Sequence, residues 1–166
     1  MTQNLIGRLN DVDLQLLRSA IAIARRSREH GNHPFGAVLA DASGRVVLEA
    51  ENNVVTGPDC TGHAETNLMR LASKELSPAA LARCTLYTST EPCPMCAGAI
   101  YWGGVGRVVY ALGQAGLYTL AGPGGDRLVL ACRDVRVSAR GARPIEVIGP
   151  ALEEEALQVH VGFWGA

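Results

Sequence analysis

Gly62-His63-Ala64-Glu65 and Glu91-Pro92-Cys93-Pro94-Met95-Cys96 stand at the two ends of the segment 62–96. Thiolates and neutral imidazoles are suitable ligands for Zn²⁺. A catalytic zinc site has three such ligands and one open position, whereas a structural site is closed by a fourth. The two motifs offer three ligands, His63, Cys93 and Cys96. They therefore predict a catalytic zinc site, in which Glu65 is a carboxylate that need not bind the metal.

Each motif is expected to open a helix. One helix is expected over about 63–76, and a second over about 94–102, where a proline in the first turn is easily accepted. The segment 84–89 is rich in strand-forming residues and delivers the chain to the second motif. Cys93 and Cys96 are three residues apart, so both sulfurs project to one side of a helix start, where the dipole favours thiolate. Two helix N-termini are therefore expected to face one metal ion.

The ligand set also indicates a reaction. Zinc on such ligands lowers the pKa of bound water enough to give hydroxide near neutral pH. Glu65, left unbound, would take the proton of that water and pass it on. Hydroxide addition to a ring carbon that bears an amino group creates a need for protons, first at the ring nitrogen and then at the departing ammonia. The sequence thus predicts hydrolytic deamination, with Glu65 as the proton shuttle.

The rest of the chain alternates between helical and strand patterns. Strands alternating with helices predict an α/β fold with right-handed crossovers, in which a largely parallel core is joined to an antiparallel hairpin. The segment 113–139 is expected to be a loop with a short helix near Leu117, because Gly122-Pro123-Gly124-Gly125 interrupts it. The other expected elements are a helix over 11–30, hairpin strands over 35–40 and 45–51, strands over 107–112 and 144–148, and a closing helix over about 152–164.

Composition limits the possible classes of protein. The 166 residues, 48% hydrophobic and 19% charged, are sufficient for one packed domain. Fifteen Lys and Arg against sixteen Asp and Glu give a net charge of −1, which disfavours a nucleic-acid or anionic-lipid partner. The apolar runs are far shorter than the roughly 20 residues that span a bilayer. An odd number of cysteines and no signal-peptide pattern predict reduced thiols and a cytoplasmic location.

Three cysteines lie outside the second motif. Cys60 stands three residues before His63, so it could act as a fourth ligand and close the site. Cys84 and Cys132 lie in strand-like surroundings, where buried and inert thiols are the usual case.

The two motifs, together with Phe35-Gly36-Ala37-Val38 and Asn52-Asn53-Val54, resemble the cytidine deaminase-like superfamily of zinc deaminases over residues 34–111. The resemblance implies a three-layer α/β/α fold with a central five-stranded mixed sheet. It also implies one zinc ion per chain on His63, Cys93 and Cys96, Glu65 as proton shuttle, and a homodimer.

Within the superfamily, Asn52-Asn53-Val54 and Ile100-Tyr101-Trp102 are most similar to the bacterial guanine deaminases. This likeness implies a small nucleobase-like substrate, guanine or cytosine in type, with Asn52 on the edge of the base. Phe35, Ala64 and Trp102 are the other implied substrate contacts. Guanine deaminases carry an acidic residue after the strand that ends near residue 111. Asp126 is the only carboxylate between Tyr110 and Arg133 in this chain.

Two other functions remain open. The tRNA adenosine deaminases are similar over 91–100, but they usually carry a basic stretch where this chain has Leu112-Gly113-Gln114-Ala115-Gly116. A zinc-stabilised binding module without catalysis is the alternative from another class. At the C-terminus, Phe163 and Trp164 could fold an aromatic lid over the pocket, or Trp164 could simply dock the closing helix.

Overall fold

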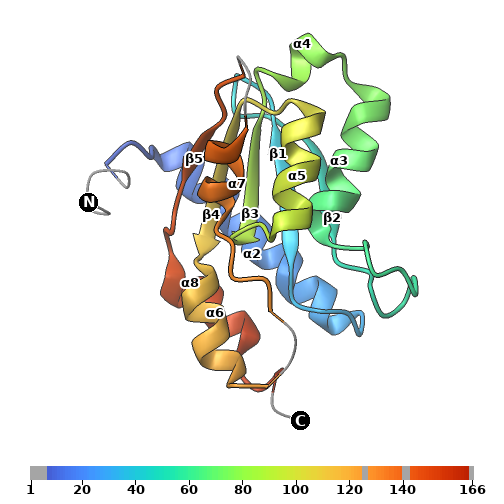
Figure 1. Ribbon diagram of the computed structural model, residues 1–166, viewed down its shortest axis with the longest axis vertical. Coiled ribbons are helices and arrows are strands. Elements are labelled where there is room, and N and C mark those ends of the chain that lie inside the picture. Colours follow the sequence, from blue (N-terminus) through green and yellow to red (C-terminus); the bar gives the residue numbers. More distant parts are fainter. Residues whose placement is uncertain (1–6, 125–126, 140–142, 165–166) are drawn as a thin grey trace.

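The computed structural model describes residues 7–124, 127–139 and 143–164, so the expected acidic position at Asp126 lies outside the described residues. The centre is a five-stranded sheet in the order β2-β1-β3-β4-β5 (Figure 1). β1 pairs antiparallel with both β2 and β3, whereas β3, β4 and β5 are parallel. This mixed sheet confirms the predicted architecture. The strands are β1 (Gly36–Ala40), β2 (Val46–Glu51), β3 (Thr85–Thr90), β4 (Arg107–Leu112) and β5 (Glu146–Ile148).

Helices cover both faces of the sheet (Figure 1). Successive side chains of a strand point to opposite faces. Val38 and Val109 accordingly belong to the buried cluster shared with α2 and α8, and Leu39 and Val108 to the cluster shared with α3, α5 and α7. The result is the expected three-layer arrangement. The helices are α2 (Asp11–Glu29), α3 (Ala64–Glu75), α4 (Pro78–Leu81), α5 (Pro94–Gly103), α6 (Gln114–Ala121), α7 (Cys132–Ser138) and α8 (Glu153–His160).

Two helix ends are set by capping residues that are adjacent to them in the sequence. α2 begins with a capping box, in which the Asp13 N–H donates to Asn10 Oδ1 at 2.9 Å and the Asn10 N–H donates to Asp13 Oδ2 at 3.0 Å. α5 ends at Gly104, whose φ of 79° is the left-handed conformation that glycine adopts without strain. Both ends agree with the sequence prediction to within two residues.

The structure corrects one expectation and adds two details. Cys132 does not lie in a strand but opens α7, a helix that the sequence did not predict. Leu71 of α3 is 41% exposed, because Ala64, Leu68 and Ala72 already form the buried row one helical turn apart. After Ser77 the chain starts the short helix α4, which the Ser77 hydroxyl caps by accepting from the Ala80 N–H at 3.2 Å.

No helix within the described ranges is both long and apolar enough to cross a membrane.

A close backbone contact fixes α2 on the sheet. A Cβ atom added at Gly36 would lie 2.5 Å from Ala20 O and 2.5 Å from Ala24 N of α2, both of them backbone atoms that cannot rotate away. Gly36→Ala is therefore expected to lower the free energy of unfolding by about 1–3 kcal/mol. Urea denaturation measures this difference. Gly7→Ala is the matched control, since nothing lies within 4 Å of the added Cβ. Equal stability of the two variants would contradict the tight α2–β1 contact.

Candidate active site

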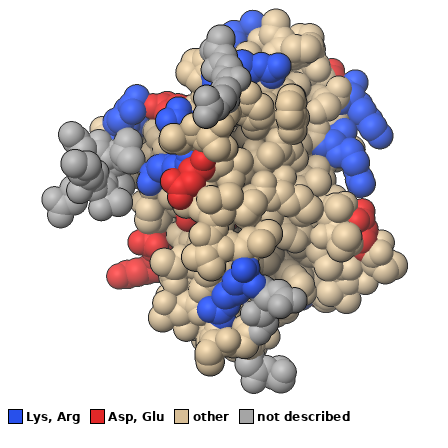
Figure 2. Space-filling view, in the orientation of Figure 1, with Lys and Arg blue, Asp and Glu red and all other residues tan. Residues whose placement is uncertain are grey.

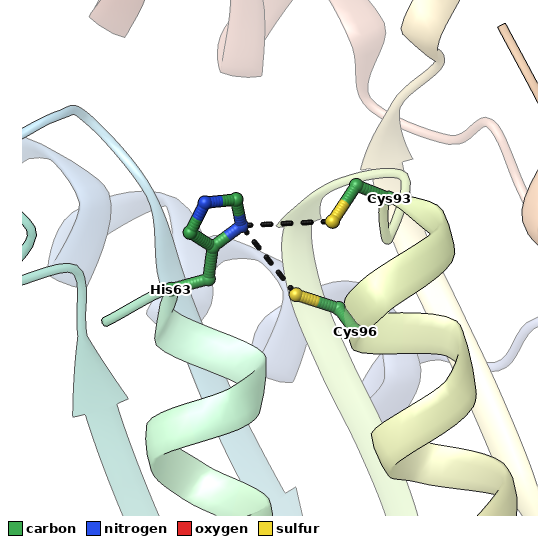
Figure 3. Close-up of side chains that lie close together, drawn as sticks. All are labelled: His63, Cys93 and Cys96. Carbon is green, nitrogen blue, oxygen red and sulfur yellow. Dashed lines mark hydrogen bonds between the residues drawn. The ribbon is translucent and has the colours of Figure 1, made fainter. Parts of the chain in front are cut away.

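The three ligands of the two motifs meet at the N-termini of α3 and α5 (Figure 3). His63 Nδ1 lies 3.6 Å from Cys93 Sγ and 3.5 Å from Cys96 Sγ. Tetrahedral Zn²⁺ with its usual Zn–N and Zn–S bond lengths would place such nitrogen and sulfur atoms about 3.5 Å apart. All three donor atoms lie within 4.8 Å of one another. The spacing therefore fits a single zinc ion held by these three residues.

The charge of this cluster also fits a cation. A hydrogen bond from Cys96 lowers the pKa of Cys93 to about 4, and His63 contributes in the same direction. That hydrogen bond and burial raise the pKa of Cys96. The pair thus accepts one negative charge easily and resists a second, so two neighbouring thiolates require a positive ion between them.

Both helices begin at ligand residues instead of ordinary caps. His63 is the N-cap of α3 and Cys93 is the N-cap of α5, and neither side chain makes a capping hydrogen bond. Ser, Thr, Asp or Asn is preferred at this position, because its side chain accepts a free backbone N–H. The free N–H groups leave the positive ends of both helices directed at the cluster, which favours thiolate.

Cys60 is not part of the cluster. Its side chain is exposed in the loop before α3. In the parts of the chain that the structure describes, the group that could hold a metal here consists of His63, Cys93 and Cys96. The described residues therefore offer three protein ligands here, a number that fits the open arrangement of a catalytic centre.

Glu65 is buried beside the cluster, 5% exposed, in the first turn of α3. Burial raises the pKa of its carboxyl group. The Thr88 hydroxyl lies 2.9 Å from Glu65 Oε1 and 3.1 Å from the Thr90 carbonyl oxygen. A hydroxyl has one proton and can also accept. Thr88 can therefore donate to the carboxylate when Glu65 is charged, and to the Thr90 carbonyl when Glu65 carries a proton.

A cavity of about 400 Å³ opens at this cluster, and His63, Glu65 and Cys93 form part of its wall. The volume falls within the roughly 300–1,000 Å³ that is usual for small-molecule sites. The rest of the lining comes from segments far apart in the sequence, namely His33, Phe35, Thr90, Glu91, Gln114, Leu117, Tyr118, Ala121, Gly124, Arg127 and Trp164.

The expected substrate contacts have different outcomes. Phe35 lines the cavity. Asn52 is fully buried, and its Oδ1 accepts from the Val54 N–H at 3.1 Å, while its Nδ2 has no hydrogen-bond partner. A buried donor without a partner is uncommon and suits a group that awaits a ligand, although Asn52 does not itself line the cavity. The Ala64 side chain is packed in the core, and its N–H is one of the free donors of the first turn of α3.

Trp102 requires a correction. Its side chain is 80% exposed, packs edge-on against Tyr101 and does not line the cavity. The reason is the direction of α5, which starts at the cluster and carries Trp102 about 13 Å along its axis from Cys93. Within one chain, Trp102 does not contact the site.

The C-terminal aromatic residue does reach the site. Trp164 lines the cavity, and its Nε1 donates to His160 Nδ1 at 3.1 Å. Burial lowers the pKa of His160 to about 4, so this imidazole is neutral and able to accept. Arg28 of α2 donates at 2.8 Å to the carbonyls of both Val159 and Val161. Trp164 thus docks on the end of α8, which was one of the two possibilities, and it also forms part of the cavity wall.

Glu91 organises the wall, a role that the sequence did not reveal. Its Oε2 accepts from the Gln114 N–H at 3.1 Å, and its Oε1 accepts from the Cys132 N–H at 3.1 Å. These are the first residues of α6 and α7, and neither helix has a side-chain cap from its own N-cap residue. One carboxylate, two residues before Cys93, therefore caps two helices and ties them to the ligand turn.

Replacement of Glu91 by Gln should loosen both helices, because an amide NH₂ cannot accept one of the two N–H donors. We expect the free energy of unfolding to fall by about 1–2 kcal/mol, with faster hydrogen exchange at the starts of α6 and α7 and unchanged zinc content. Denaturation, exchange and metal analysis measure the three quantities. Glu155→Gln, which removes only an exposed ion pair with Arg18, is the control. Unchanged exchange in both helices would rule out the double cap.

Known proteins match both the sequence and this geometry. Residues 10–112 match the family model of the cytidine and deoxycytidylate deaminase zinc-binding region. A Schizosaccharomyces pombe protein named "Probable cytosine deaminase" is 42% identical over 158 residues, which cover 94% of each chain. A Bacillus subtilis protein named "Guanine deaminase" is 46% identical over 96 residues, or 57% of this chain and 61% of that protein.

A solved structure of a guanine deaminase from Nitrosomonas europaea superposes with a TM-score of 0.72 at 26% sequence identity. The superposition covers 87% of this chain and 80% of the other. The fold therefore extends to proteins that are much less similar in sequence.

Proposed function

The chain belongs to the cytidine and deoxycytidylate deaminase family of zinc-binding aminohydrolases, and we propose that it deaminates a free nucleobase of the cytosine type. The observation that carries the proposal is the meeting of His63, Cys93, Cys96 and Glu65 at one cavity of small-molecule size. An open three-ligand site beside a buried carboxylate is suited to adding water to an amino-substituted ring carbon.

The extent of the two alignments supports cytosine over guanine. Much of the cavity wall lies after residue 112, in α6, at Gly124 and Arg127, and at Trp164. The S. pombe relative aligns over 94% of this chain, whereas the B. subtilis guanine deaminase aligns over 57%. Because the wall contacts the substrate, a relative that matches over nearly the whole length is the better guide to the ring.

The chain's own residues have distinct parts in the proposed reaction. His63, Cys93 and Cys96 would hold one zinc ion per chain, which supplies a positive charge that acidifies water and stabilises developing negative charge. Glu65 takes one proton from water and gives it to the ring nitrogen. It then carries the hydroxyl proton of the addition product to the leaving amine, which departs as ammonia while the ring carbon becomes a carbonyl. Thr88 can hydrogen-bond to Glu65 in both protonation states. It donates to the charged carboxylate, and when Glu65 carries a proton it accepts from Glu65 and donates to the Thr90 carbonyl oxygen instead. Phe35 and Trp164 provide apolar surface for a flat ring.

Glu65→Gln should lower kcat/KM by at least about 10² to 10⁴, the range that positioned proton transfer contributes. Zinc content should stay at one ion per chain, and the fold should be intact. Ammonia release is measured with cytosine, guanine, adenine, cytidine and tRNA, and metal content by elemental analysis. Glu75→Gln, the same substitution at an exposed site on α3, is the control. Near-normal turnover by Glu65→Gln would defeat the mechanism, and wild-type activity restricted to guanine, to cytidine or to tRNA would overturn the cytosine assignment.

We also propose a homodimer that buries the outer surface of α3 and α5. These helices pack side by side (Figure 1), and they expose Leu71 and Trp102 respectively. An exposed tryptophan offers up to roughly 150–250 Å² of apolar surface for burial. Light scattering should therefore give twice the chain mass for the wild type and the chain mass for Trp102→Glu. A monomeric wild type, or a dimeric Trp102→Glu variant, would contradict the proposed surface.

A further inference from the structure

Arg127 is the one Lys or Arg among the residues that line the catalytic cavity. Its guanidinium lies over the Tyr118 ring, 5.0 Å from the centroid, and its Nη2 donates to the Gly124 carbonyl at 3.2 Å. Among the described residues, no carboxylate lies within ion-pair distance of Arg127. The side chain thus keeps its charge and most of its five N–H donors for another partner.

The carboxylates of the same cavity already have partners. Both oxygens of Glu91 accept backbone N–H groups, and Glu65 accepts from Thr88. Neither forms an ion pair with Arg127. The face shown in Figure 2 is largely uncharged, and its charged side chains lie in a few small groups, some of which contain both basic and acidic residues. Within the described residues, Arg127 therefore has no carboxylate partner of the kind that usually neutralises a purely structural cation.

The cavity wall has two chemically different parts. The reactive part, with His63, Glu65 and Cys93, comes from the starts of α3 and α5. Tyr118 and Arg127 come from α6 and from the segment that follows it, and Tyr118 lines the same cavity. A ring whose amino group sits at the reactive part presents its other substituents to the remaining wall. Stacking on Tyr118 holds the guanidinium in place, and its planar fork of donors matches the two oxygens of a carboxylate.

We propose that Arg127 is a specificity-determining residue that binds a carboxylate substituent on the ring of the substrate. The preferred substrate class is then a carboxylated amino-heterocycle, and the unsubstituted base is a poorer member of the same series. This inference rests on the proposed deaminase function. It names a second group of the substrate that the cavity recognises, in addition to the amino-substituted ring carbon. The charge-assisted bidentate pair predicts a preference of roughly 10- to 100-fold in kcat/KM.

The test compares cytosine, cytosine-5-carboxylate and deoxycytidine monophosphate as substrates of the wild type, Arg127→Met and Arg127→Lys. We expect the wild type to prefer the carboxylated base at least tenfold, Arg127→Met to lose this preference, and Arg127→Lys to keep part of it. Arg25→Met, at an exposed position on α2, is the control and should keep the full preference.

Two results would overturn the proposal, namely equal kcat/KM for the two bases in the wild type, or an unchanged ratio in Arg127→Met. A stronger preference for the monophosphate, lost in Arg127→Met, would overturn the carboxylate assignment. Calorimetric binding of cytosine-5-carboxylate to Glu65→Gln, with and without Arg127→Met, separates recognition from turnover. Binding of cytosine-5-carboxylate that depends on Arg127 supports the inference even if no base is deaminated. Turnover of cytosine without such binding contradicts the inference but agrees with the proposed deaminase function.

Discussion

Two cysteine sulfurs and an imidazole nitrogen within 4.8 Å of one another set the requirement that the rest of the structure meets. Neighbouring thiolates repel, so the cluster is stable only with a cation and with the positive ends of α3 and α5 beside it. His63 and Cys93 occupy the N-cap positions and make no capping bonds there, which costs each helix about 0.5–2 kcal/mol. Tertiary packing must offset that cost, and the fully buried Leu68 and Ile100 belong to the cluster that holds both helices on the sheet.

A second constraint connects the ligand turn with the cavity wall. Glu91 lies between Thr90, at the end of β3, and the cysteine ligands, and its two oxygens hold the starts of α6 and α7. Parallel strands β3 and β4 end at the same edge of the sheet, which brings the connections after them together. Glu91 is therefore close in sequence to the cysteine ligands and also makes the hydrogen bonds that hold the helices of the cavity wall. A shift of either part would disturb the other.

These contacts explain what the sequence could predict. The ligands and Glu65 were predictable because their spacing at helix starts is local, and the hairpin and α2 were predictable because their turns and caps are local. α7 was not, because its cap comes from Glu91, forty-one residues earlier. Trp102 was misplaced because a motif gives a residue's neighbours along the chain but not the face on which a helix presents it. His33, Tyr118 and Arg127 carry no motif, and only the folded chain brings them to one cavity.

The residues proposed to carry out the reaction lie in short sequence motifs, whereas the residues proposed to contact the substrate ring come from segments far apart in the sequence. The family match ends at residue 112, after the last ligand and before most of the distinctive wall. A deaminating centre needs fixed ligands and a fixed proton carrier, so its residues are confined to short motifs at two helix starts. The wall has no such requirement, because any segment that reaches the cavity can contact the ring. Relatives can therefore share the reaction and differ in the ring they accept.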